Sequence, residues 1–152
     1  MLEHALPEII RVYGPDHPSA LGARLQLDDQ RLLVGRTAGL EADLESMVEL
    51  ATPPGGRRGW LIFARETLGR VRTAAGHPRD AETLLREALD RRRKEPTAVY
   101  NLALSEQALA ECLEAQKKFA EAQPLYQSSY DRLKKLLGPE AYVTRQAAQH
   151  LK

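Results

Sequence analysis

Apolar side chains recur every three or four residues along most of this chain, which places them on one face of an α-helix. In one such segment, Leu61, Ala64, Leu68 and Val71 keep this spacing without a break. Glycine and proline interrupt the pattern at intervals, and these residues commonly end one helix and begin the next. The pattern predicts helices over residues 2–13, 18–34, 39–51, 58–75, 78–94, 97–116, 119–137 and 139–151.

The predicted helices repeat with a period of 41 residues. Leu27, Leu68 and Leu109 are separated by this interval, and six further sets share the register. These sets are Ala20, Leu61 and Leu102; Ala23, Ala64 and Ser105; Gly35, Gly76 and Lys117; Leu40, Ala81 and Ala122; Leu44, Leu85 and Tyr126; and Met47, Ala88 and Ser129. Most sets hold small or apolar residues, as recurring packing positions should.

We therefore expect an all-α fold in which seven to eight helices form antiparallel pairs that stack into an α–α superhelix. Gly14 and Gly138, each followed by proline, lie 124 residues apart, close to three periods. The predicted organisation is a single repeat domain over 1–152, with units at about 14–54, 55–95 and 96–137 and partial or capping helices at 1–13 and 138–152. The first unit should be the least regular, because Glu41, Glu45 and Glu49 place like charges along one side of a helix.

Charge and composition narrow the choice of partner and compartment. The chain carries 22 basic and 21 acidic residues, so nothing in this balance favours nucleic acid or an anionic membrane. The N-terminal residues lack the apolar core of a signal peptide, and no apolar stretch approaches membrane-spanning length. The single cysteine, Cys112, fits a reducing compartment. We expect a cytoplasmic protein without a membrane partner.

The residues that usually carry catalysis or bind metals do not gather at informative spacings. The four histidines are scattered, and none has a second ligand on the same helix face. Asp28 and Asp29 are adjacent, so their side chains should face different ways and should not share a proton. Cys112 lies beside Leu113 and is expected to be a small buried residue. The sequence predicts no enzyme, no metal site and no cofactor.

Part of the second unit resembles the tetratricopeptide repeat. Leu68-Gly69 is followed by Gly76, Ala81, Leu85 and Ala88 in the order of that signature. Residues 117–126 and Leu137-Gly138-Pro139 are similar to the longer repeats, of about 41–42 residues, of the kinesin-light-chain type. In the first unit the Leu-Gly pair is replaced by Leu27-Asp28. The resemblance implies a stack of helix pairs that binds other proteins. Arrays of this kind are widespread in bacteria, often joined to kinase or transcription-factor domains.

The resemblance also implies a concave groove lined by the first helix of each pair. The residues expected to line it are Leu25, Asp29, Leu32, Phe63, Glu66, Arg70, Thr73, Leu104, Gln107, Glu111, Glu114 and Arg145. An equally weighted alternative is that Leu25, Leu32 and Leu104 only complete the core.

The expected function is that of a protein–protein interaction module. Its groove should bind a peptide or a partner protein that offers an apolar anchor and at least one basic residue. Two alternatives stay open. The array could associate with itself or serve as a spacer, or it could be a regulatory segment of a larger bacterial kinase or transcriptional regulator.

Overall fold

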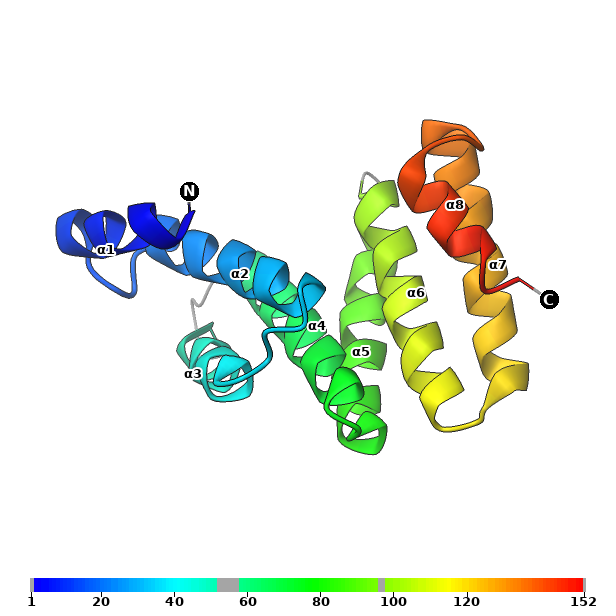
Figure 1. Cartoon of the computed structure of the whole chain (residues 1–152), viewed down its shortest axis with the longest axis horizontal. Helices are drawn as coiled ribbons and strands as arrows, with labels where there is room; N and C mark the ends of the chain where they lie inside the picture. The colour runs from blue at the N-terminus through cyan, green and yellow to red at the C-terminus, as the bar shows by residue number, and fades with distance from the viewer. Residues whose placement is uncertain (1, 52–57, 96–97, 152) are drawn as a thin grey trace.

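The protein is all-helical, as the sequence predicts. A computed structural model describes residues 2–51, 58–95 and 98–151, and over these residues it contains eight helices and no strand (Figure 1). The helices are α1 (Leu2–Tyr13), α2 (Pro18–Leu33), α3 (Leu40–Ala51), α4 (Arg58–Ala74), α5 (Pro78–Arg93), α6 (Val99–Ala115), α7 (Phe119–Leu137) and α8 (Tyr142–Ala148). The predicted boundary between the first two units, at residues 54–55, lies outside the described residues.

The last helix is shorter than the predicted range of 139–151. Ala141 has an extended backbone, with φ −62° and ψ 139°, so α8 begins only at Tyr142. Beyond Ala148 the backbone N–H groups of Gln149 and His150 bond carbonyls three residues back, which is the tighter pattern of a helix end. The apolar pattern therefore extended past both ends of the helix itself.

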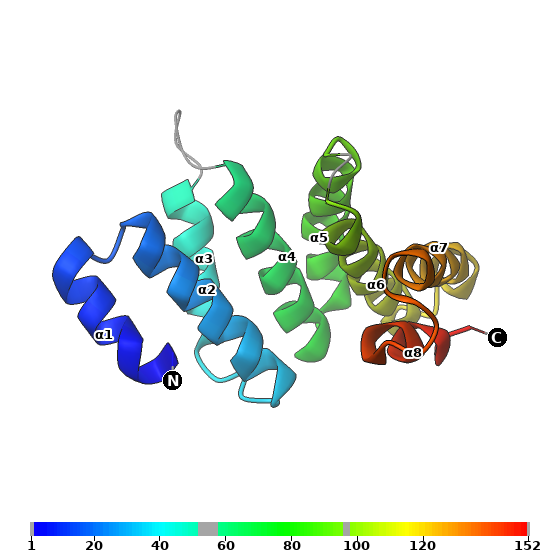
Figure 2. The ribbon, with the colours of Figure 1, turned by 90° about the horizontal axis from the view of Figure 1, so that it is seen from above.

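Consecutive helices pack against each other along the stack, and Figure 2 shows them side by side from α1 to α8. The first helices of the units also contact each other directly, α2 with α4 and α4 with α6. The α4–α5 and α6–α7 pairs have extensive contacts. In the first unit α2 and α3 touch over a few residues only, and α3 packs mainly on α4. This packing is compatible with a helical-repeat solenoid whose first unit is the least regular.

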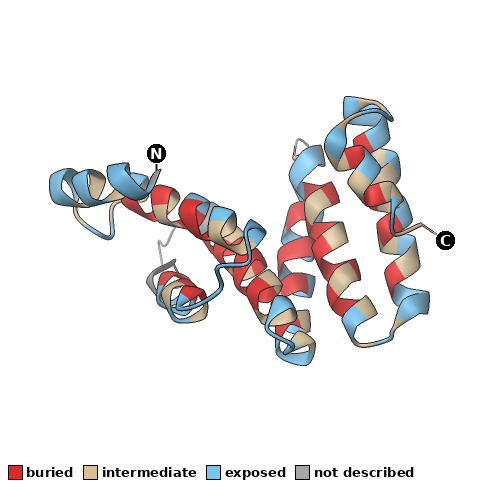
Figure 3. Cartoon of the chain, in the orientation of Figure 1, coloured by how far each residue is buried: buried red, intermediate tan, exposed pale blue. Residues whose placement is uncertain are grey.

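The core follows the 41-residue register. Every member of the six sets built from small and apolar residues is buried, and the buried positions face the helix–helix contacts in Figure 3. Two large clusters result. One joins α2, α3 and α4 around Leu44, and the other joins α5, α6 and α7 around Tyr126. A smaller cluster of Ala103, Leu133 and Ala147 fastens α8 to α6 and α7. Equivalent positions are therefore buried in all three units, which is compatible with the predicted repeat.

Polar contacts repeat in the same register. Three equivalent positions on the first helices each reach the second helix of their own unit, although their charges differ. The contacts are Arg24 to Asp43, Arg65 to Glu87 at 2.8 Å, and Glu106 to Ser128 at 2.9 Å and Arg132 at 3.2 Å. The three units thus share the position of this contact, although the residue types that make it differ.

A second repeated position joins each second helix to the end of the next first helix. The residues at this position are Glu41, Glu82 and Gln123. Glu41 accepts from Arg72 at 2.8 Å, Glu82 accepts from Lys118 at 2.8 Å, and Gln123 donates to the His150 carbonyl at 3.2 Å. Arg72 also bonds Glu45 at 2.6 Å, so α4 neutralises two of the like charges on α3.

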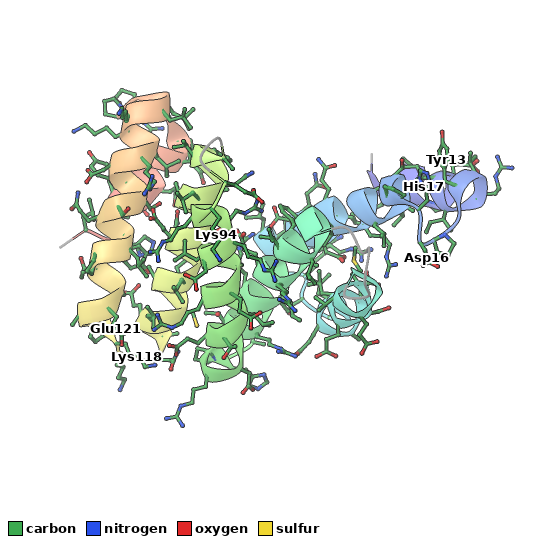
Figure 4. The ribbon with its side chains drawn as sticks, turned by 180° about the vertical axis from the view of Figure 1, so that it is seen from behind. Tyr13, Asp16, His17, Lys94, Lys118 and Glu121 are labelled. Carbon is green, nitrogen blue, oxygen red and sulfur yellow. The ribbon has the colours of Figure 1, made fainter. Side chains whose placement is uncertain are left out.

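Glu82 is the centre of the joint between α5 and the start of α7. Its carboxylate accepts from Lys118 and Gln116, both at 2.8 Å, and pairs with Arg86 at 2.8 Å. Arg86 continues to Glu121 at 2.9 Å, and Figure 4 shows Lys118 and Glu121 together near the start of α7. The Lys118 ammonium, followed by Gln116 and Arg86, lowers the pKa of Glu82 to about 2.

Replacing Glu82 by Gln should lower the free energy of unfolding at pH 7 by about 1 kcal/mol, the usual size for a largely exposed ion-pair network. A lowered pKa means that the carboxylate stabilises the fold above its ordinary pKa of 4.5 and loses this effect as the pH falls towards 2. Urea unfolding at a series of pH values measures the difference. Asp131→Asn on α7, where Asp131 bonds Gln127 alone, is the matched control. A difference that is constant from pH 5 to pH 2 would contradict the assignment.

The turn position shared by Gly35, Gly76 and Lys117 has a positive φ in all three units, at 73°, 85° and 62°. Glycine adopts this conformation without strain, whereas a side chain costs about 1 kcal/mol. Lys117 is the one non-glycine residue with positive φ in the described part of the chain. The turn of the third unit is therefore strained, whereas glycine avoids this strain in the first two units.

Lys117→Gly should raise the free energy of unfolding by about 0.5–1 kcal/mol, because it removes this strain. Thermal or urea unfolding measures the gain. Gly76→Ala is the converse change: it should be destabilising through backbone strain alone, since no atom lies within 4 Å of an added Cβ. A Lys117→Gly protein less stable than the parent would show that the lysine side chain contributes more than its backbone costs.

Candidate functional site

The residues expected to line a groove lie on the first helices α2, α4 and α6 and on α8, and the structure divides them by burial. Leu25, 1% exposed, belongs to the core cluster of α2, α3 and α4. Leu32 and Phe63 are half-buried against the same cluster, and Leu104 on α6 is also half-buried. Leu25 therefore completes the core and offers no surface to a partner, whereas the other three keep some exposed area.

Glu66 is the second residue of the predicted groove that is buried, at 8% exposed. Its carboxylate accepts a hydrogen bond from the Ser105 hydroxyl at 2.8 Å and lies 3.6 Å from Nε of Arg92. Burial raises the pKa of Glu66, and Ser105, Arg92 and Arg70 partly oppose that rise. Glu66 thus ties α4 to α5 and α6 instead of facing a ligand.

Asp29, Arg70 and Glu111 occupy one register position on α2, α4 and α6. Asp29 accepts a hydrogen bond from the guanidinium of Arg70, so these two charges neutralise each other between neighbouring first helices. Glu111 accepts from Gln107 at 3.2 Å and has no basic partner among the described residues. This row of three charged residues, here called the charge ladder, therefore ends on α6 with a carboxylate that no described basic side chain neutralises.

Glu114 belongs to a cluster that fixes the C-terminal end of the described chain. The hydroxyl of Tyr126 donates to Glu114 at 2.7 Å, and Nδ1 of His150 lies 3.6 Å from the same carboxylate oxygen. The Tyr126 and His150 rings are stacked, with centroids 4.4 Å apart. Burial and then the Glu114 carboxylate raise the pKa of Tyr126. The sequence identified Tyr126 as a packing position, but it held no signal for the contact with His150.

The two remaining residues of the predicted groove differ in their availability. The Thr73 hydroxyl donates to the Gly69 carbonyl one turn back at 2.9 Å, which occupies its donor. Arg145 on α8 is exposed and has no ion-pair partner in the described part of the chain. The surface that stays open on this side thus consists of the half-buried Leu32, Phe63 and Leu104, the Glu111 carboxylate and Arg145.

Two hollows in the described part of the molecule lie elsewhere. One of about 360 Å³ is bounded by α5, α6 and α7, with Leu89, Leu109 and Leu125 among its lining residues. Its charged residues Arg86 and Glu121 already bond each other at 2.9 Å. A wider hollow of about 860 Å³ lies between the turns that precede α5 and α7. Neither hollow includes a residue of the predicted groove.

Within residues 2–51, 58–95 and 98–151 no three His, Cys, Asp or Glu side chains are arranged to hold a metal ion. Cys112 is fully buried, its thiol donates to the Pro78 carbonyl at 3.1 Å, and burial raises its pKa. Across the same residues, no helix has the length and apolar character needed to cross a membrane.

Tyr126→Phe should lower the free energy of unfolding by about 1 kcal/mol, because it removes a hydrogen bond to a carboxylate while keeping the ring. The loss should be accompanied by faster amide hydrogen exchange in α8, which the stacked His150 helps to anchor. Gln127→Ala, an exposed change one residue further on, is the control. Unchanged stability and exchange would mean that the Tyr126–Glu114 contact contributes nothing to holding this end.

No protein-family model matches the sequence, and no curated protein matches it either. The resemblance to tetratricopeptide repeats therefore depends on the sequence positions quoted for it.

Proposed function

We propose that this chain is a protein–protein interaction module of the tetratricopeptide type and that it binds a peptide or partner segment along the side formed by its first helices. The observation that carries the proposal is the direct contact of α2 with α4 and of α4 with α6. Because these helices touch, their outward sides form one surface that spans the three units. Stacked helix pairs commonly use such a surface for binding.

The charges on this surface favour a basic partner. Asp29 and Arg70 satisfy each other, whereas Glu111 retains a net negative charge. An arginine or lysine of the ligand would complete the charge ladder at Glu111. Half-buried Phe63 and Leu32 offer apolar area on the neighbouring helices, and a few anchors of this kind can supply most of the binding energy. The proposed ligand therefore combines a basic residue with an apolar side chain.

Panning a displayed library of random peptides on the full chain tests the proposal. Enriched sequences should combine a basic and an apolar residue, and their affinity should fall at high salt because the charge pair is partly exposed. Glu111→Gln should weaken binding about tenfold, and Phe63→Ala with Glu111→Gln about a hundredfold. Asp131→Asn, which removes an exposed carboxylate on the second helix α7, should have no effect.

Three outcomes would count against the proposal. These are a library without enrichment, enriched peptides that lack basic residues, or affinities unchanged in both groove variants. Thermal unfolding of each variant separates a loss of binding from a loss of fold. This check matters most for Phe63→Ala, since Phe63 packs against the core cluster of the first two units.

Self-association is a second candidate, supported by exposed apolar side chains at one end of the stack. Leu136, Leu137 and Tyr142, near the α7–α8 turn, are 49%, 46% and 69% exposed. Light scattering over a range of concentrations distinguishes the two functions. A dimer that is lost in Leu137→Ser with Tyr142→Ser would favour association through this end, and a monomer at all concentrations would exclude it.

A further inference from the structure

Asp28 occupies a position where the other units have a very small residue. The equivalent residues are Gly69 on α4 and Ala110 on α6. A Cβ added at Gly69 would lie 2.6 Å from Cγ of Leu85, which shows how closely α4 approaches α5. Ala110 is fully buried on α6. The first unit instead has a carboxyl group here, and α2 and α3 have far fewer contacts than the other pairs.

The Asp28 carboxyl is almost completely buried, at 1% exposed. Its Oδ2 atom has no hydrogen-bond donor among the described groups. The Asp28 carboxyl interacts with a second carboxyl, that of Asp43 on α3, which Arg24 of α2 holds beside this part of the helix. Arg31 lies 3.5 Å from Oδ1, and Arg24 is already bonded to Asp43. Two ionised carboxylates in contact repel each other, whereas one proton between them makes a strong hydrogen bond. Protonation of one carboxyl would therefore remove the repulsion and add a hydrogen bond between α2 and α3.

We propose that Asp28 and Asp43 form a proton-binding clasp that holds α3 against α2 when Asp28 is protonated and loosens when it ionises. In the closed state the Asp28 carboxylic acid donates its O–H to the Asp43 carboxylate, which also accepts a hydrogen bond from Arg24. Loss of the proton leaves a buried negative charge beside a second one. Apart from the Arg24–Asp43 bond and the core cluster that they share with α4, α2 and α3 have little contact, so this repulsion acts on a loosely packed pair of helices.

The surrounding charges agree with this assignment. Burial and then contact with Asp43 raise the pKa of Asp28 from 3.8 to about 7, against the opposing effect of Arg31 and Arg24. Arg31 is also drawn towards Glu3 of α1, at 3.9 Å. The nearby cations of α4 are engaged elsewhere, Arg70 by Asp29 and Arg72 by Glu41 and Glu45. Among the side chains that the structure describes, neither α1 nor α4 therefore supplies Asp28 with a free cation.

The direction of the pH effect follows from the raised pKa. The clasp stabilises the fold fully below pH 3.8, loses this effect as the pH rises to about 7, and changes little above that value. If opening of α3 returns Asp28 to water, its opening constant should rise about tenfold between pH 6 and pH 8. The α6–α7 pair has no such group at the equivalent position and should not respond.

Amide hydrogen exchange of the full chain at pH 6 and pH 8, corrected for the intrinsic exchange rate, measures this opening. We expect protection of the α3 amides to fall about tenfold in the parent protein. Asp28→Asn should abolish the dependence and increase protection at pH 8, because its amide group donates the same hydrogen bond at both pH values. Asp29→Asn, adjacent in sequence but paired with Arg70, should retain the tenfold change.

Asp43→Asn provides an independent variant, since it removes the second carboxylate and should also flatten the pH dependence. The clasp is refuted if α3 protection in the parent is the same at both pH values, or if Asp28→Asn and Asp43→Asn keep the parent's tenfold change. These measurements need no ligand and remain informative whether or not the first-helix surface binds a peptide.

Discussion

The distance of closest approach between the two helices of a unit is set by the side chain at one repeated position, and the rest of the structure depends on it. Gly69 allows Leu85 to reach the backbone of α4, and Ala110, at the equivalent position, is fully buried on α6. These two pairs form the well-packed part of the stack. In the first unit Asp28 occupies this position, and α3 packs mainly on α4. The unit with the largest side chain at this position is thus the one whose two helices contact each other least.

Electrostatic contacts recur at the same positions in each unit, although the sign of the charge at these positions differs between units. Arg24, Arg65 and Glu106 differ in sign, yet each is joined to the second helix of its own unit. Most of the charged groups near the helix contacts are paired in this way. The few without an oppositely charged partner therefore indicate where a ligand's charge would be bound. Glu111 is one of them, and it lies in register with a neutralised pair on the preceding helices. This contrast is the reason to place binding on that side of the stack.

The proposed binding surface and the proton clasp share the helix α2 but use different sides of it. Asp29 faces α4 and belongs to the charge ladder, whereas Asp28 faces α3 and is buried. Adjacent residues on a helix point about 100° apart, so the two carboxyls act independently. Opening of α3 would loosen the support beneath α2 without removing any residue of the ladder.

Local spacing in the sequence was sufficient to predict the helices and their register, because three- and four-residue periodicity and Gly or Pro breaks act within a few residues. The depth of burial was not accessible in this way: Leu25 and Glu66 face the groove by register, yet neighbouring helices cover them. The sequence also showed like charges on α3, but it did not reveal that Arg72 of α4 neutralises two of them. The sequence correctly indicated that Asp28 and Asp29 face different ways. Only the tertiary structure brings Asp43 to Asp28, because contacts between helices depend on packing distance and not on position along the chain.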